Sequence, residues 1–164
     1  MWDLYWEVRL SALEDLGKRE AILVASRLIR ALAEAPSKPV RMLELGCGEG
    51  QIIGALLEAH AQATGIQDSV GVDYRRGSVQ TCRRLYPGMR FLEGDFTDPE
   101  LLAGLGQFEI VLLVNALHEV FSATFSSELG EVDVPAAKMR VQQALGGATG
   151  RLVDGGWMVL FDGL

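Results

Sequence analysis

The sequence predicts an α/β protein, built on a parallel sheet of five strands with helices on both faces. Two observations carry this prediction. Short apolar runs alternate along the chain with stretches whose apolar residues recur every three or four positions, a pattern typical of strands joined by crossover helices. The run IVLLV at residues 110–114 has no polar face, as expected for a central strand that is covered on both sides.

The N-terminal part predicts two amphipathic helices ahead of the sheet. Apolar residues recur at helical spacing over residues 2–16 and again over residues 22–32, and Gly17 separates the two stretches. Two prolines end the second stretch. We therefore expect a helical cap over residues 1–39, followed by the α/β core over residues 40–164.

The core is expected to alternate strands and helices in chain order. The predicted strands cover residues 40–45, 69–73, 89–92, 110–114 and 157–161. The predicted helices cover residues 51–62, 78–85, 99–105 and 135–145. Ligands of open parallel sheets bind beyond the carboxyl ends of the strands, so the residues that follow each strand are the candidates for a site.

The first strand leads into a turn rich in glycine. The string Glu44-Leu45-Gly46-Cys47-Gly48-Glu49-Gly50 opens the next predicted helix. Glycines allow a tight turn and a close approach to a ligand, and the helix N-terminus favours an anionic ligand group. A dinucleotide fingerprint would place glycine at position 51, where this sequence has Gln51.

Acidic residues follow the second and third strands. Asp73, with Tyr74 beside it, could accept two hydrogen bonds from a ribose diol or could cap the next helix. Asp95 and Phe96 follow the third strand. Thr97 and Asp98 are better placed as helix caps, which favours a ligand-binding role for Asp95.

The fourth strand is followed by Asn115 and His118. The amide of Asn115 could hold an acceptor molecule or a ligand backbone group. The imidazole of His118 suits a general base at neutral pH, although a structural hydrogen bond is the alternative. Glu119, the next residue, would orient that imidazole or cap a helix.

The order of these motifs from residue 40 to residue 162 resembles that of the class I, Rossmann-like methyltransferases. The resemblance implies a three-layer αβα sandwich, S-adenosyl-L-methionine as the cofactor, and methyl transfer to an oxygen or nitrogen nucleophile. It makes His118 and Asn115 the candidate catalytic residues. The cofactor-binding residues that it implies are Glu44, Gly46, Cys47, Gly48, Gly50, Asp73, Tyr74, Asp95, Phe96 and Asn115.

The chain departs from that family at its C-terminal end. The family's sheet has seven strands, whereas this chain stops at Leu164 directly after the fifth, so strands six and seven are expected to be missing. The exposed sheet edge or the N-terminal helices would then offer a surface for self-association. Two alternatives remain open, a nicotinamide-dependent oxidoreductase of Rossmann type and a non-catalytic, methyltransferase-like partner subunit.

The amino-acid composition limits the kinds of partner that the protein is expected to bind. The 164 residues include 22 acidic and 15 basic side chains, a net charge of −7, which argues against a broad nucleic-acid-binding surface. A small-molecule acceptor is favoured, while a protein or RNA acceptor stays open. The two cysteines have no metal-ligand or disulfide spacing, so no metal is expected. The charged N-terminus and the absence of a long apolar run predict a cytoplasmic protein without a membrane segment.

Overall fold

The computed structural model describes residues 16–34, 39–128 and 130–163. Its main sheet has five strands in the order β3-β2-β1-β4-β7, and every neighbouring pair is parallel. The predicted parallel α/β fold is therefore confirmed. The strands of this sheet are β1 (Met42–Leu45), β2 (Val70–Asp73), β3 (Arg90–Glu93), β4 (Phe108–Val114) and β7 (Leu152–Phe161).

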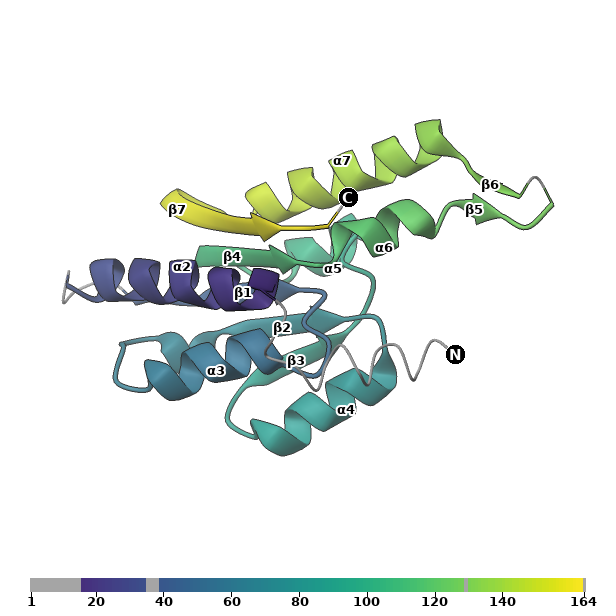
Figure 1. Cartoon of the computed structure of the whole chain (residues 1–164). Coiled ribbons are helices and arrows are strands. Elements are labelled where there is room, and N and C mark those ends of the chain that lie inside the picture. Colours follow the sequence, from purple (N-terminus) through teal and green to yellow (C-terminus); the bar gives the residue numbers. More distant parts are fainter. Residues whose placement is uncertain (1–15, 35–38, 129, 164) are drawn as a thin grey trace.

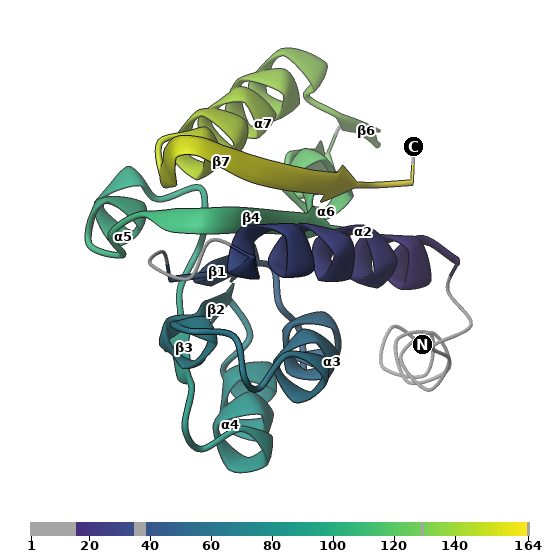
Figure 2. The ribbon, with the colours of Figure 1, turned by 90° about the vertical axis from the view of Figure 1, so that its left-hand side faces the viewer.

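Helices cover both faces of the sheet (Figures 1 and 2). Three of them bury apolar side chains against one face, and these are α2 (Leu16–Ala33), α3 (Gln51–Ala59) and α4 (Arg76–Leu85). Three others pack on the opposite face, and these are α5 (Pro99–Ala103), α6 (Leu117–Ser122) and α7 (Val134–Thr149). The arrangement is a three-layer αβα sandwich.

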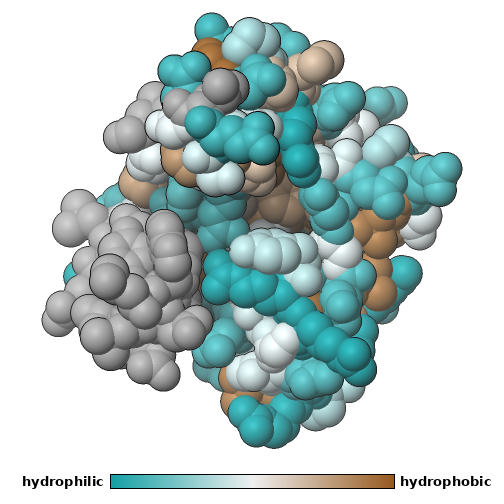
Figure 3. All heavy atoms as spheres, turned by 90° about the vertical axis from the view of Figure 1, so that its right-hand side faces the viewer, coloured by the Kyte–Doolittle hydropathy of each residue, from teal (hydrophilic) through white to brown (hydrophobic). Residues whose placement is uncertain are grey.

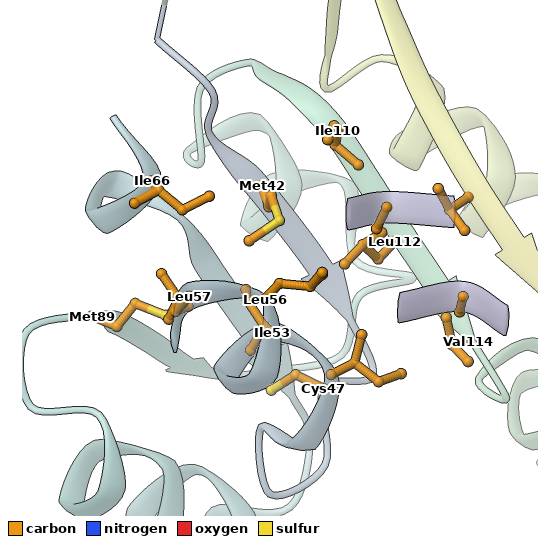
Figure 4. Close-up of a cluster of buried hydrophobic side chains, with 14 of the residues drawn as sticks. Met42, Cys47, Ile53, Leu56, Leu57, Ile66, Met89, Ile110, Leu112 and Val114 are labelled. Carbon is orange, nitrogen blue, oxygen red and sulfur yellow. The ribbon is translucent and has the colours of Figure 1, made fainter. Parts of the chain in front are cut away.

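The centre of the sheet is formed by β1 and β4, in which every residue is buried. Figure 4 shows part of the core, where Ile53 and Leu56 of α3 lie near Met42 of β1 and Leu112 of β4. From β1 the chain runs outward to β2 and β3, and it then returns to the other side of β1 as β4. This reversal of strand order creates a switch point, and in such sheets the ligand crevice lies at the carboxyl ends beside it.

Helix α2 is the second of the two predicted N-terminal helices. It buries Ala21, Ala25 and Ile29 in the core and packs against α3 and β7. A 2.7 Å hydrogen bond between Ser26 Oγ and His60 Nε2 joins it to the end of α3. The first predicted helix lies outside the described residues, and the division of the chain after residue 39 stays a prediction.

Three features differ from the predicted pattern. Strand β7 begins at Leu152 rather than at residue 157, so it includes Asp154-Gly155-Gly156, and its pairing with β4 shifts register there. A short antiparallel hairpin, β5 (Phe125–Ser126) and β6 (Glu131–Val132), precedes α7. A single 3-10 turn, η1 (Ile66–Asp68), leads into β2.

Among the described residues, β7 is the last strand and forms one edge of the sheet. Trp157 and Leu160 on this strand are each about half exposed, at 52% and 50%. The described helices include none with the length and apolar character of a membrane span.

Candidate functional site

A cavity of about 250 Å³ opens at the carboxyl ends of β1, β2 and β4, beside the switch point. Small-molecule sites typically occupy roughly 300–1,000 Å³, so this volume lies just below that range. Figure 3 views this side of the molecule, where an apolar recess lies among hydrophilic side chains. The described residues that line the cavity are Lys18, Glu44, Gly46, Cys47, Gly48, Glu49, Gln51, Ile52, Asp73, Tyr74, Arg75, Ser78, Phe96, Val114, Asn115, Ala116 and Glu119.

The glycine-rich turn between β1 and α3 forms one wall of the cavity. The backbone N–H groups of Gly46 and Cys47 both donate to the carbonyl of Val72, at 2.8 and 3.0 Å, which ties the turn to β2. Gly46 has φ +76°, and a Cβ there would lie 2.7 Å from the Cβ of Ala116. Gly48 has φ +51°, and a Cβ there would meet no atom within 4 Å. The turn therefore requires glycine, and it leaves its backbone open at Gly48.

Asp73, at the end of β2, joins the turn to the second strand. Its Oδ2 accepts the N–H of Gly48 at 2.8 Å, and its Oδ1 accepts the N–H of Arg75 at 2.8 Å. The residue is 5% exposed and lines the cavity. Because each carboxylate oxygen has two lone pairs, both oxygens can still accept a hydrogen bond from a ligand hydroxyl.

Glu44 lies beneath the turn as a fully buried carboxyl group. Its Oε2 accepts the N–H of Ile53 at 3.1 Å. Burial raises the pKa of Glu44 to about 8, the hydrogen bond from Ile53 and the charge of Lys18 lower it, and the charge of Asp73 raises it further. The side chain is therefore mostly protonated at neutral pH in the unliganded protein.

The two predicted site residues that follow β3, Asp95 and Phe96, differ in their burial and in their position relative to the cavity. Phe96 is buried and lines the cavity, at 7% exposed. Asp95 is 52% exposed at its side chain and does not line it. Its Oδ1 accepts the N–H and the hydroxyl of Thr97, both at 2.8 Å, and its Oδ2 accepts Nη2 of Arg140 from α7 at 3.1 Å.

Tyr74, Arg75 and Glu119 form the outer rim. The Arg75 guanidinium lies 5.4 Å from the centroid of the half-exposed Tyr74 ring, and its Nε donates to the Tyr74 hydroxyl at 3.2 Å. Its Nη2 forms an ion pair of 3.0 Å with Oε1 of Glu119, in the first turn of α6. Burial raises the pKa of Glu119, and the charges of Arg75 and His118 lower it.

The candidate catalytic residues after β4 differ in position. Asn115 lines the cavity and has φ +52°, a left-handed conformation that asparagine tolerates better than most residues. His118 does not line the cavity. Its Nδ1 donates to Oδ1 of Asp162 at 2.8 Å, and Oδ2 of Asp162 accepts the N–H of Leu117. Asp162 directly follows β7, so His118 is held at the ends of β4 and β7.

Eight of the ten predicted cofactor-binding residues come together around the cavity, the exceptions being Gly50 and Asp95. Four charged lining residues escaped prediction as site residues, namely Lys18, Glu49, Arg75 and Glu119. The strand order carries a signal for the last two, since residues after β2 and β4 must flank the turn after β1. Lys18 has no such signal, because the docking of α2 depends on packing between distant segments.

The charge of the lining is mainly acidic. It includes the carboxylates of Glu49, Asp73 and Glu119, against the cations of Lys18 and Arg75, while the buried Glu44 is mostly protonated. Such a lining favours a ligand with positive charge. Within the described ranges, no group of three or more His, Cys, Asp or Glu side chains is arranged to hold a metal ion.

Cys47 is a buried thiol in the turn. The hydrogen bond to Cys82 and burial both raise its pKa well above the ordinary thiol value. The Sγ of Cys82 donates to the carbonyl of Gly48 at 3.2 Å. Because the thiolate is the reactive form of cysteine, Cys47 fills the turn rather than acting as a nucleophile.

Sequence comparison identifies the family. Residues 42–132, which contain the turn, Asp73, Phe96 and the segment after β4, match the family described as the methyltransferase domain. The match spans more than half of the chain, so the chain belongs to this family. A comparison with curated proteins gives no match.

Solved structures share the fold. The S-adenosylmethionine-bound CalS10, an amino pentose methyltransferase from Micromonospora echinaspora, has a TM-score of 0.64 and 25% identity, covering 98% of this chain and 56% of its own. The sugar N-methyltransferase KedS8 from Streptoalloteichus sp. has a TM-score of 0.62 and 18% identity, covering 100% and 53%. A TehB-like methyltransferase from Corynebacterium glutamicum has a TM-score of 0.59 and 20% identity, covering 96% and 68%. The chain thus spans about half the length of the first two.

Proposed function

We propose that this domain binds S-adenosyl-L-methionine and serves methyl transfer to an oxygen or nitrogen nucleophile of a small molecule. One observation carries the proposal. The hydrogen bond from the Gly48 N–H to Asp73 Oδ2 joins the open glycine turn and a strand-end carboxylate in one cavity. Membership of the methyltransferase domain family supports this interpretation.

The lining fits the chemical groups of this cofactor. Asp73 would accept the ribose hydroxyls, while Phe96 and Tyr74 would contact the adenine ring. The open backbone at Gly48 would accommodate the amino-acid part, whose carboxylate is favoured at the N-terminus of α3. The acidic lining suits a sulfonium cation. When bound, the cofactor supplies an electrophilic methyl group.

The acceptor would approach from the β4 side. Asn115 would hold a polar group of the acceptor, and His118 stays a candidate general base at the ends of β4 and β7. Many methyl transfers need no base, so positioning would contribute most of the catalysis. The small cavity and the net charge of −7 favour a small molecule, as does the similarity to an amino pentose methyltransferase.

Binding of S-adenosylhomocysteine, measured by isothermal titration calorimetry, tests the donor half of the proposal. We expect saturable binding to the wild-type chain and none of reduced nicotinamide cofactor. Asp73→Asn should weaken the affinity at least about tenfold, because it removes a charged acceptor from the ribose. Asp68→Asn, an exposed carboxylate in η1, is the matched control and should leave the affinity unchanged.

Two results would contradict this function. The first is the absence of S-adenosylhomocysteine binding at millimolar ligand in a chain whose circular dichroism is that of a folded α/β protein. The second is tight binding of the nicotinamide cofactor in place of S-adenosylhomocysteine.

A further inference from the structure

An ion pair spans the cavity above the glycine turn. Arg75 follows β2 and Glu119 belongs to α6, which follows β4, while β1 lies between these two strands in the sheet. The 3.0 Å contact between Arg75 Nη2 and Glu119 Oε1 therefore bridges the loop that follows β1. Both side chains are partly buried, at 37% and 29% exposed, and both line the cavity.

Contacts with its neighbours Asp73 and Tyr74 fix the position of Arg75. Its backbone N–H donates to Asp73, its Nε donates to the Tyr74 hydroxyl, and its guanidinium covers the Tyr74 ring. Three contacts thus set the position from which it donates to Oε1 of Glu119. In the part of the chain that the structure describes, no hydrogen bond reaches Oε2 of Glu119.

Among the described lining residues from β4 and the segment that follows it, Glu119 is the one with a charged side chain. Its neighbours in the lining from this side are Val114, Asn115 and Ala116, two apolar residues and a neutral amide. A carboxylate that is partly buried with one oxygen already engaged has lost part of its hydration, and a cation bound at the other oxygen would compensate for that loss.

We propose that Glu119 binds the nitrogen of the methyl acceptor, and that the acceptor is an amine, which arrives as an ammonium ion. The nitrogen would release one proton to solvent before its lone pair attacks the methyl carbon. The bond from the methyl carbon to sulfur then breaks, so that S-adenosylhomocysteine and a methylated ammonium ion form, and Glu119 would stabilise the positive charge that returns to the nitrogen. This inference rests on the proposed function, because it assigns the acceptor side of the same cavity. Arg75 would act as a positioning residue that orients the carboxylate. A hydroxyl acceptor could also donate a hydrogen bond to this carboxylate, but it carries no positive charge to offset the partly buried negative charge of Glu119.

Two cofactor analogues test the inference without a known acceptor. Sinefungin has a carbon in place of the sulfur and carries an amine where S-adenosylmethionine carries its methyl group, whereas S-adenosylhomocysteine has no group at the position of the methyl. If Glu119 faces that position, sinefungin should bind the wild-type chain more tightly than S-adenosylhomocysteine. Glu119→Gln should reduce the ratio of the two affinities at least about tenfold. The affinity of this variant for S-adenosylhomocysteine should differ from that of the wild-type chain by less than about threefold.

Glu100→Gln is the matched control, because it makes the same chemical change at an exposed glutamate of α5 that lies outside the described cavity lining. It should keep the wild-type preference. Glu119→Asp keeps the charge and should keep part of the preference, which provides a second variant if the glutamine variant folds poorly. Thermal denaturation of each variant reports on folding.

The inference is overturned if Glu119→Gln keeps the wild-type preference for sinefungin, or if Glu100→Gln loses as much of it. Either result, together with normal binding of S-adenosylhomocysteine, would leave the proposed function standing. Failure of the wild-type chain to bind S-adenosylhomocysteine would instead remove the proposed function and this inference with it.

Discussion

At the scale of single residues, Glu44 shows how the site raises the energy of a charged group. The side chain is buried between β1 and α3, and its carboxyl group accepts a backbone N–H from the helix. That contact does not offset the loss of hydration, so the pKa of Glu44 rises from 4.5 to about 8. A cationic ligand nearby would favour the ionised form.

The raised pKa of Glu44 predicts a pH-dependent stability. Between about pH 4.5 and pH 8 the folded chain holds a proton on Glu44 that the unfolded chain has released. The contribution of Glu44 to the free energy of unfolding is therefore fully present below pH 4.5 and is lost as the pH rises to about 8. Urea denaturation at several pH values should show this decline relative to Glu44→Gln. Parallel curves for the two proteins would contradict the burial argument.

Asp95 gives a second prediction. The family resemblance implies that this residue binds the cofactor, whereas its carboxylate accepts hydrogen bonds from Thr97 and from Arg140 of α7. We expect Asp95→Asn to weaken S-adenosylhomocysteine binding less than Asp73→Asn does, in calorimetric titrations at the same pH. An equal or larger loss would mean that Asp95 turns toward the ligand on binding.

At the scale of elements, the sequence predicts well the unit formed by β1, the glycine turn and α3. Three glycines at alternate positions, following an apolar run and preceding a helical pattern, are a local signal. The partner of Asp95 is not a local signal, because Arg140 is 45 residues away in the chain. Similarly, the two-residue strands β5 and β6 are too short to produce an alternating pattern.

Two glycines of the turn should respond differently to substitution by alanine. At Gly46 the new methyl group would meet the Cβ of Ala116 at 2.7 Å, in addition to the cost of a positive φ. At Gly48 the φ is also positive, but the space is open. We expect Gly46→Ala to lower the free energy of unfolding by about 1–3 kcal/mol, and more than Gly48→Ala does.

Gly48→Ala should instead act on the ligand, because its methyl group would enter the open space of the cavity wall. Urea denaturation and calorimetry with S-adenosylhomocysteine separate the two effects. A larger stability loss for Gly48→Ala than for Gly46→Ala would show that the turn is packed differently from the structure.

At the scale of the whole molecule, strand order decides where the separate motifs meet. Glu44, Asp73, Phe96 and Asn115 are spread over more than 70 residues, yet all of them line one cavity at the carboxyl end of the sheet. A parallel sheet with a switch point beside β1 produces this convergence, which is why most of the site could be predicted. The placement of α2 could not, since its apolar face fits either side of a sheet.

Ligand binding should stabilise the whole domain. At a ligand concentration about 100 times the dissociation constant, S-adenosylhomocysteine should add about 2.7 kcal/mol to the free energy of unfolding. For a domain of this size that corresponds to a rise in Tm of roughly 5–11 °C, measurable by differential scanning fluorimetry. An unchanged Tm at saturating ligand would mean that the unfolded chain binds as well as the folded one.

The two histidines of the chain lie in separate layers of the molecule. His60 joins α2 to α3 through Ser26, and His118 joins the ends of β4 and β7 through Asp162. Their imidazole signals in a proton NMR spectrum would therefore be natural probes of two different events. The signal of His60 would report the docking of α2, and the signal of His118 would report changes where strands β4 and β7 end.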